Sequence, residues 1–213
     1  MLDLNEIISK LKYLSEIHVV SVDGECKEVL ALLSDRLKNM KDLEEVGITL
    51  EMGNEHNPLI CCVNITDKKT GAEPFFFTKK EEKESECEYA DSPESFLYEP
   101  NASILKAGAF KSVACHFEIK KLHPNSHLYT SDIFQPDFPG RLFNVVDTFT
   151  FNKQDLKRLS SVVTKANLTV RNFPMQVADL RKRLKINEGG DDFLFATTLN
   201  DNSKVLILCK KLG

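Results

Sequence analysis

Several features that often reveal a protein's function are missing from this sequence of 213 residues. It has no tryptophan, no CxxC pair and no glycine before Gly24. No apolar run approaches the ~18 residues that a membrane-spanning helix needs. The N-terminus carries Asp3 and Glu6 where a secretory signal would be basic. We therefore expect a cytoplasmic protein without a membrane partner.

The six cysteines form no recognisable disulfide or metal pattern. Cys61 and Cys62 fall inside an apolar run, so we expect them in the core of a strand, as free thiols in a reducing compartment. His116, His123 and His127 lie near Cys115, but no second ligand pair has the spacing of a zinc site. Because "HPNSH" is rich in turn-forming residues, we expect a turn there and no metal.

The sequence also lacks a nucleophile elbow and a phosphate-binding loop, so it does not identify catalytic residues. Cys26 lies near the start of an expected helix, which would lower the pKa of its thiol, but no histidine is near it in the sequence. Asp23 or Glu25 would suit the ribose hydroxyls of a nucleotide, but that role needs a strand and a glycine loop about twenty residues earlier. The alternative is a turn between a strand and a helix that caps the helix.

Charge is distributed unevenly along the chain. Residues 1–97 hold 11 Lys and Arg against 21 Asp and Glu, a net charge of −10. Residues 98–213 hold 17 against 11, a net charge of +6. Part of the acidity comes from "KKEEKESECEYADSPE" at 79–94, which we interpret as a solvated linker. Because the net charges of the two halves have opposite signs, we expect the halves to bind different partners.

Hydrophobic periodicity predicts an α/β arrangement in the acidic half. Asp3 is expected to cap the first helix, and "IHVVSV" is short, β-branched and bounded by charge, as buried parallel strands are. The predicted order is that of the closing portion of an open sheet: helix 4–14, strand 17–22, helix 26–37, and strands 47–53, 58–65 and 73–78, the last two forming a hairpin.

The basic half is predicted to begin with a helix over 98–117, with Pro100 in its first turn. Beyond it, residues 141–212 are predicted to form a compact two-layer α+β module of order β-α-β-α-β-β. Its elements, preceded by a strand at 126–132, are strand 141–151, helix 152–163, strand 166–173, helix 174–186 and hairpin 191–212. "INEGGDD" at 186–192 is expected to be a flexible turn.

Basic residues concentrate in this last module. If they share one surface, they would form a patch that follows the phosphates of a nucleic acid, and duplex RNA is recognised mainly by shape and backbone. The alternative is that they are ordinary solvated charges, partly balanced by Asp179 and Glu188. The candidate RNA-binding residues are Arg171, Arg181, Lys182, Arg183, Lys185, Lys210 and Lys211.

Three stretches carry a family resemblance: "YEPNASILKAG", "KLHPNSHLYTSD…FPGR" and "TVRNFPMQVADLRKRLKINEGGDDFLFATTLNDNSKVLILCKK". They resemble the C-terminal part of a bacterial group of class I S-adenosylmethionine-dependent methyltransferase-like proteins. The resemblance is close over 96–213 and looser over 1–78. It implies a truncated Rossmann-like methyltransferase portion at 1–78, an acidic linker at 79–95, a ferredoxin-like segment at 96–140 and a THUMP-like domain at 141–213.

In that family the glycine loop, the acidic ribose-binding residue and the catalytic strand end lie upstream of where this chain begins, so Met1 resembles an internal methionine. The resemblance therefore implies no cofactor bound by this chain, although S-adenosylmethionine is expected for the full-length family. It implies the substrate-recognition portion of an RNA methyltransferase, inactive alone, with tRNA or rRNA as partner. The alternative is a protein-interaction or structural module. We also expect residues 1–78 either to pair with another copy through the open edge at strand 17–22 or to be poorly ordered. The alternative is a monomer in which helix 4–14 covers that edge.

Overall fold

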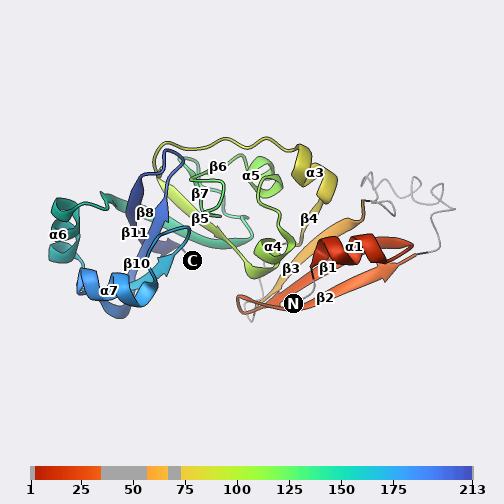
Figure 1. Ribbon diagram of the computed structural model, residues 1–213, viewed down its shortest axis with the longest axis horizontal. Coiled ribbons are helices and arrows are strands. Elements are labelled where there is room, and N and C mark those ends of the chain that lie inside the picture. Colours follow the sequence, from red (N-terminus) through yellow and green to blue (C-terminus); the bar gives the residue numbers. More distant parts are fainter. Residues whose placement is uncertain (1–2, 35–56, 67–72, 213) are drawn as a thin grey trace. The chain divides into compact units, whose positions relative to one another are not determined.

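The computed structural model describes residues 3–34, 57–66 and 73–212. The chain divides into two compact units, each built from two stretches of sequence (Figure 1). The first unit contains residues 1–85 and 101–112, and the second contains residues 86–100 and 113–213. Residues 101–112, which the sequence placed beyond the acidic linker, thus belong to the first unit.

The first unit is built on a four-stranded sheet of order β2-β1-β3-β4. Strand β1 (Leu14–Val22) runs parallel to β3 (Leu59–Ile65) and antiparallel to β2 (Glu25–Leu33), and β4 (Phe75–Thr78) runs antiparallel to β3. Helix α1 (Leu4–Lys10) precedes the sheet, α3 (Lys79–Glu84) follows β4, and α4 (Ala102–Ala107) packs against the three strands β1, β2 and β3. The strands predicted at 17–22, 58–65 and 73–78 are confirmed.

The core of this sheet comes from alternating residues that face the same side. Ile17 pairs with Ile60 and Val19 with Cys62, and all four side chains are buried. Phe77 continues the row on β4. The expected core positions of the two adjacent cysteines are confirmed, and burial raises the pKa of the Cys62 thiol.

The helix predicted over 26–37 is wrong, because residues 25–33 form strand β2. Asp23 and Gly24 both have positive φ, 49° and 81°, and connect β1 to β2 as a two-residue hairpin turn. Cys26 therefore lies in a strand opposite Ser21, not at a helix start. The strand at 17–22 is also not the open edge, since β2 and β3 pair with β1 on either side.

The second unit contains one seven-stranded sheet of order β6-β7-β5-β8-β11-β10-β9. Its strands are β5 (Phe96–Pro100), β6 (Lys120–Lys121), β7 (Tyr129–Ser131), β8 (Gly140–Thr150), β9 (Lys165–Val170), β10 (Asn187–Thr198) and β11 (Lys204–Leu212). Its helices are α5 (Ser112–His116, which begins on the last residue of the first unit), α6 (Lys153–Val162) and α7 (Val177–Leu184). The predicted β-α-β-α-β-β order of 141–212 is confirmed.

Two apolar clusters lie on opposite faces of this sheet. Leu206 and Leu208 of β11 pack with Leu159 of α6 and Leu184 of α7, so these helices cover one face. Ile207 and the residues two positions before and after it, Val205 and Cys209, pack with side chains of β5 and of the loop 122–128. We call the side that carries α6 and α7 the helical face and the other side the opposite face.

Two predictions for this part of the chain are wrong. The helix expected over 98–117 is split into β5, α4 and α5, because Pro100 ends a strand and Gly108 caps α4. "INEGGDD" lies almost wholly within β10, where the pairing with β9 slips between Glu188 and Phe193. The stretch expected as a linker begins with α3, whose cap is a reciprocal pair of hydrogen bonds between Thr78 and Glu81, and the boundary between the two units falls within that stretch, after Ser85.

Candidate nucleic-acid interface

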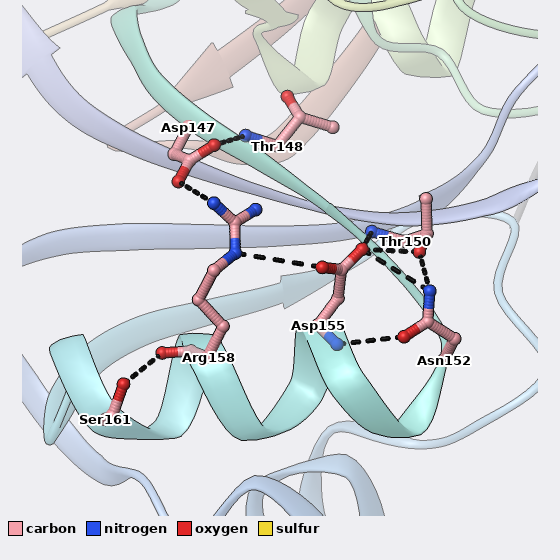
Figure 2. A network of polar contacts seen from close by, with 7 residues as sticks. All are labelled: Asp147, Thr148, Thr150, Asn152, Asp155, Arg158 and Ser161. Atoms are coloured by element: carbon pink, nitrogen blue, oxygen red, sulfur yellow. Dashed lines mark hydrogen bonds and ion pairs between the residues drawn. The ribbon is translucent and has the colours of Figure 1, made fainter.

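Helix α6 is fixed to strand β8 at its N-terminus (Figure 2). The Asn152 side chain caps the helix by accepting from the backbone N–H of Asp155 at 2.8 Å. The Asp155 carboxylate in turn accepts from the hydroxyl of Thr150 at 2.6 Å and from its backbone N–H at 3.0 Å. These two hydrogen bonds hold the pKa of Asp155 below its usual value. The predicted asparagine cap is confirmed.

Arg158, on the next turn of α6, is also committed to the fold. Its guanidinium lies 4.3 Å from the centre of the Phe149 ring and pairs with Asp147 at 3.3 Å and Asp155 at 3.7 Å (Figure 2). One of these aspartates is in β8 and the other is in α6, so the ion pairs of Arg158 connect the helix to the strand. We therefore do not count Arg158 among the residues that could bind a ligand.

Helix α7 packs beside α6 on the helical face (Figure 1). The hydroxyl of Ser160 in α6 donates to the backbone carbonyl of Leu184 at the end of α7, at 2.9 Å. Arg183 places its guanidinium 4.5 Å from the centre of the Phe151 ring, just before α6 begins. Arg181 points to the other flank of α7, where it donates to the carbonyl of Ala166 at 3.4 Å.

Four lysines on these two helices have no carboxylate partner among the described residues. Lys153 and Lys157 lie seven and three residues before Ser160, so helical periodicity places them on the flank of α6 that faces α7. Lys182 and Lys185 are exposed on α7 and at its C-cap. We call the set Lys153, Lys157, Lys182, Arg183 and Lys185 the α6–α7 basic face. All five side chains are cationic and exposed; Arg183 stacks on Phe151, and the four lysines have no ion pair within the described residues.

The structure does not gather all of the candidate residues on this face. Arg171 lies on the opposite face, where it pairs with Glu99 at 2.8 Å. Lys210 pairs with Asp192 at 2.8 Å across two neighbouring strands, and that hydrogen bond raises the pKa of the lysine. Lys211 follows it on β11 and is exposed. Of the seven candidates, Lys182, Arg183 and Lys185 belong to the basic face, and Arg181 lies beside it.

Lys153 and Lys157 were missed in the sequence analysis. The available signal was their four-residue spacing within a helix that was itself predicted correctly. The charges at 181–185 are adjacent in the sequence and easily noticed, whereas Lys153 and Lys157 come together only on the surface of a helix.

Arg171 instead belongs to a buried charge cluster. Glu99 of β5 is 3% exposed, and its carboxylate accepts hydrogen bonds from Arg171 and from both the Nε and the Nη2 of Arg141 in β8. The two arginines come from strand β8 and from the end of β9. The cluster thus joins the first strand of the unit to the α+β module by charge-assisted hydrogen bonds.

Among the described residues, no three His, Cys, Asp or Glu side chains gather as a metal site would require. Asp23 and Glu25 lie at a hairpin between antiparallel strands, so neither the ribose role nor the helix-cap role considered above applies. A shallow pocket of about 350 Å³ in the first unit is lined by Lys79, whose amine already donates to the Ala107 carbonyl at 2.7 Å.

Comparison with known proteins assigns two segments. Residues 96–139 match the family model of a ferredoxin-like domain, and residues 140–211 match that of a THUMP-like domain. A crystal structure described as a "putative methyltransferase from Porphyromonas gingivalis W83" matches with a TM-score of 0.86 and 37% identity. The match covers 100% of this chain and 49% of that one, so this chain spans about half the length of its neighbour. None of the curated proteins compared with the chain matches it.

The comparisons agree with a mixed α/β fold that contains ferredoxin-like and THUMP-like parts. In the structure, strands of both parts belong to one sheet, joined where β5 pairs with β8. Within the described ranges, no helix has the length and apolar character to cross a membrane.

Proposed function

We propose that this chain is the RNA-recognition portion of a methyltransferase-like protein, and that the α6–α7 basic face binds RNA phosphates. The observation that carries the proposal is the set of exposed lysines on two adjacent helices of the THUMP-like domain, with no described carboxylate paired to them. THUMP-like domains are of an RNA-binding kind, and the neighbour of known structure is described as a methyltransferase. The expected RNA is a tRNA or an rRNA.

A double charge reversal tests the basic face. Lys157→Glu with Lys182→Glu changes one residue on each helix, and both side chains are exposed, so the fold should be preserved. Because phosphate contacts position an RNA without specifying its sequence, affinity should fall by about tenfold for different RNAs alike. The slope of log K against log salt should also become shallower by about two contacts.

A matched control places the same charge change on the first unit. Lys12 and Lys80 are exposed there, so Lys12→Glu with Lys80→Glu alters the net charge equally. This control should leave RNA affinity nearly unchanged. Equal losses in the two double variants would mean that only net charge matters. Absence of salt-dependent binding by the wild-type chain would instead favour a protein-interaction module without a nucleic-acid role.

The finer assignment of residues 1–78 to a Rossmann-like methyltransferase sheet is part of this proposal, as are the domain limits at 79–95, 96–140 and 141–213. We also propose that this chain alone does not bind S-adenosylmethionine. The support is that Asp23 and Gly24 join two antiparallel strands as a hairpin turn, whereas a nucleotide-binding glycine loop connects a strand to a helix. Calorimetric titration that gave micromolar affinity would contradict this.

A further inference from the structure

Part of the helical face lies beyond α6 and α7 and carries two neighbouring aromatic rings. Phe96 of β5 and Phe134 of the loop between β7 and β8 have ring centres 5.2 Å apart, tilted by 45°. Phe134 is 43% exposed, and Phe96 is half-buried. The exposed ring of Phe134 beside the half-buried ring of Phe96 makes an apolar patch, and such patches often mark binding sites.

The loop that carries Phe134 is held in place. The hydroxyl of Tyr98 donates to the carbonyl of Ile133 at 3.1 Å and accepts from the backbone N–H of Gln135 at 3.1 Å. The hydroxyl of Ser131 also donates to Ile133, at 2.8 Å. The residues on both sides of Phe134 are therefore anchored, and the ring is presented from a fixed backbone.

The ring pair and the basic helices lie on the same face of the sheet. Phe96 is directly opposite Asn144 of β8, and Asn144 is opposite Lys210 of β11. Residues opposite one another on adjacent strands point to the same side, as do residues two apart on one strand. Leu97, Phe143 and Cys209, the chain neighbours of Phe96, Asn144 and Lys210, all pack on the opposite face. Phe96, Asn144 and Lys210 therefore point to the helical face.

The polar groups beside the rings suit a nucleotide. Asn144 is exposed and carries both a donor and an acceptor, as needed to contact a base edge. Strands are about 4.8 Å apart, so Lys210 lies roughly 10 Å from Phe96, two strands across the sheet. Lys210 is paired with Asp192, so the cations of this face without a carboxylate partner among the described residues are those on the two helices.

We propose that Phe96 and Phe134 form a stacking platform for an unpaired base of single-stranded RNA that adjoins a segment bound on the α6–α7 basic face. This inference rests on the proposed function and adds the form of RNA that is recognised. Sheet surfaces with exposed aromatic rings stack bases in this way, and each stacked base contributes measurably to affinity. The positive charge of the same face favours RNA over a protein segment as the occupant.

The experiment uses the full chain and two RNA probes: a blunt hairpin, and the same hairpin with a short single-stranded tail containing 2-aminopurine, whose fluorescence falls when it stacks. The wild-type chain should bind the tailed hairpin more tightly and quench its fluorescence. Phe134→Ala should weaken binding of the tailed hairpin by about tenfold and abolish the quenching. Its affinity for the blunt hairpin should not change.

Two further variants keep the test sharp. Phe134→Trp keeps an aromatic face and should restore the quenching, whereas Ile133→Ala removes a neighbouring side chain that is 72% exposed and should have no effect. Suppose that the wild-type chain binds both hairpins and that Phe134→Ala binds and quenches as the wild type does. The stacking platform is then refuted, while RNA binding by the basic face is not. The ring pair would then be a candidate surface for docking a protein. If the wild-type chain binds neither hairpin, the proposed function fails, and this inference with it.

Discussion

Thr197 and Thr198 are adjacent on β10 and differ in how their hydroxyls are satisfied. The Thr197 hydroxyl is fully buried and has no hydrogen-bond partner within the described part of the chain. The Thr198 hydroxyl donates to the carbonyl of Asn172 at 2.5 Å. A buried hydroxyl without a partner is unfavourable, while a satisfied one contributes to stability.

We therefore expect Thr197→Val to raise the free energy of unfolding by about 1 kcal/mol, since valine has nearly the same shape without the unpaired hydroxyl. Thr198→Val should lower it by about the same amount. Urea denaturation of both variants, compared at equal m-value, measures the difference. A loss of stability in Thr197→Val would show that its hydroxyl does have a partner, such as an ordered water.

Asp155 gives the cap of α6 a dependence on pH. Its pKa in the folded protein is lowered by the hydroxyl and the N–H of Thr150. A lowered pKa means that the charged form is favoured by folding. The resulting stability is therefore complete above the unfolded pKa of about 3.9 and is lost as pH falls through the folded value.

Replacing Asp155 with Asn should remove this contribution. We expect the thermal unfolding temperature of Asp155→Asn to be lower than that of the wild-type chain at pH 7, and the difference to shrink as the pH is lowered below about 4. Thermal scans at several pH values test this. A difference that stays constant down to pH 2 would mean that charge on Asp155 has no part in the cap.

At the scale of elements, the contact between β5 and β8 holds the ferredoxin-like and THUMP-like parts in one sheet. Gly140 lies opposite Pro100 at the start of β8. A Cβ atom on Gly140 would lie 2.2 Å from the Glu99 carbonyl oxygen and 2.7 Å from the Phe138 ring. Any side chain at this position would therefore push the two strands apart.

Gly140→Ala should lower the free energy of unfolding by about 3 kcal/mol, the upper end of the usual range for an overpacked site. Gly24→Ala provides the comparison, since a Cβ there meets no atom within 4 Å and only the positive φ of 81° is disturbed. That variant should lose about 1 kcal/mol. Chemical denaturation monitored by circular dichroism ranks the two, and equal losses would disprove the close-approach argument.

At the scale of the whole molecule, the strand that could pair with another copy is β2 rather than β1, because β1 lies inside the sheet. The described four-stranded sheet ends at β2 and β4, and β2 exposes three leucines: Leu30 by 49%, Leu32 by 46% and Leu33 by 59%. A long apolar edge strand offers unpaired backbone groups and apolar surface together. If copies associate through this sheet, β2 is the strand that carries the contact.

We expect the wild-type chain to self-associate at micromolar concentration, and Leu30→Lys with Leu32→Lys to be monomeric, because charge on an edge strand opposes pairing. Sedimentation velocity over a range of concentrations measures this. The matched change Val162→Lys, at a side chain 64% exposed on α6, should leave the association intact. A wild-type chain that stays monomeric would contradict the expectation.

The sequence by itself determined the elements whose local signals agree. The strand at 141–151, the helix after Asn152 and the order of the last six elements were predictable because periodicity, caps and composition all favoured the same structure. The basic character of that module was predictable from the sequence as well. The strand predicted at 47–53 lies outside the described residues.

Tertiary structure decided the cases in which local signals conflicted or were silent. Residues 26–37 have helix-forming composition, but the Asp23–Gly24 turn and pairing with β1 make residues 25–33 a strand. The pairing of Arg171 with Glu99, 72 residues earlier, could not be read from either neighbourhood. Which cations remain free for a ligand depends on which carboxylates the fold brings to the others, and that is set by strand order and register rather than by local sequence.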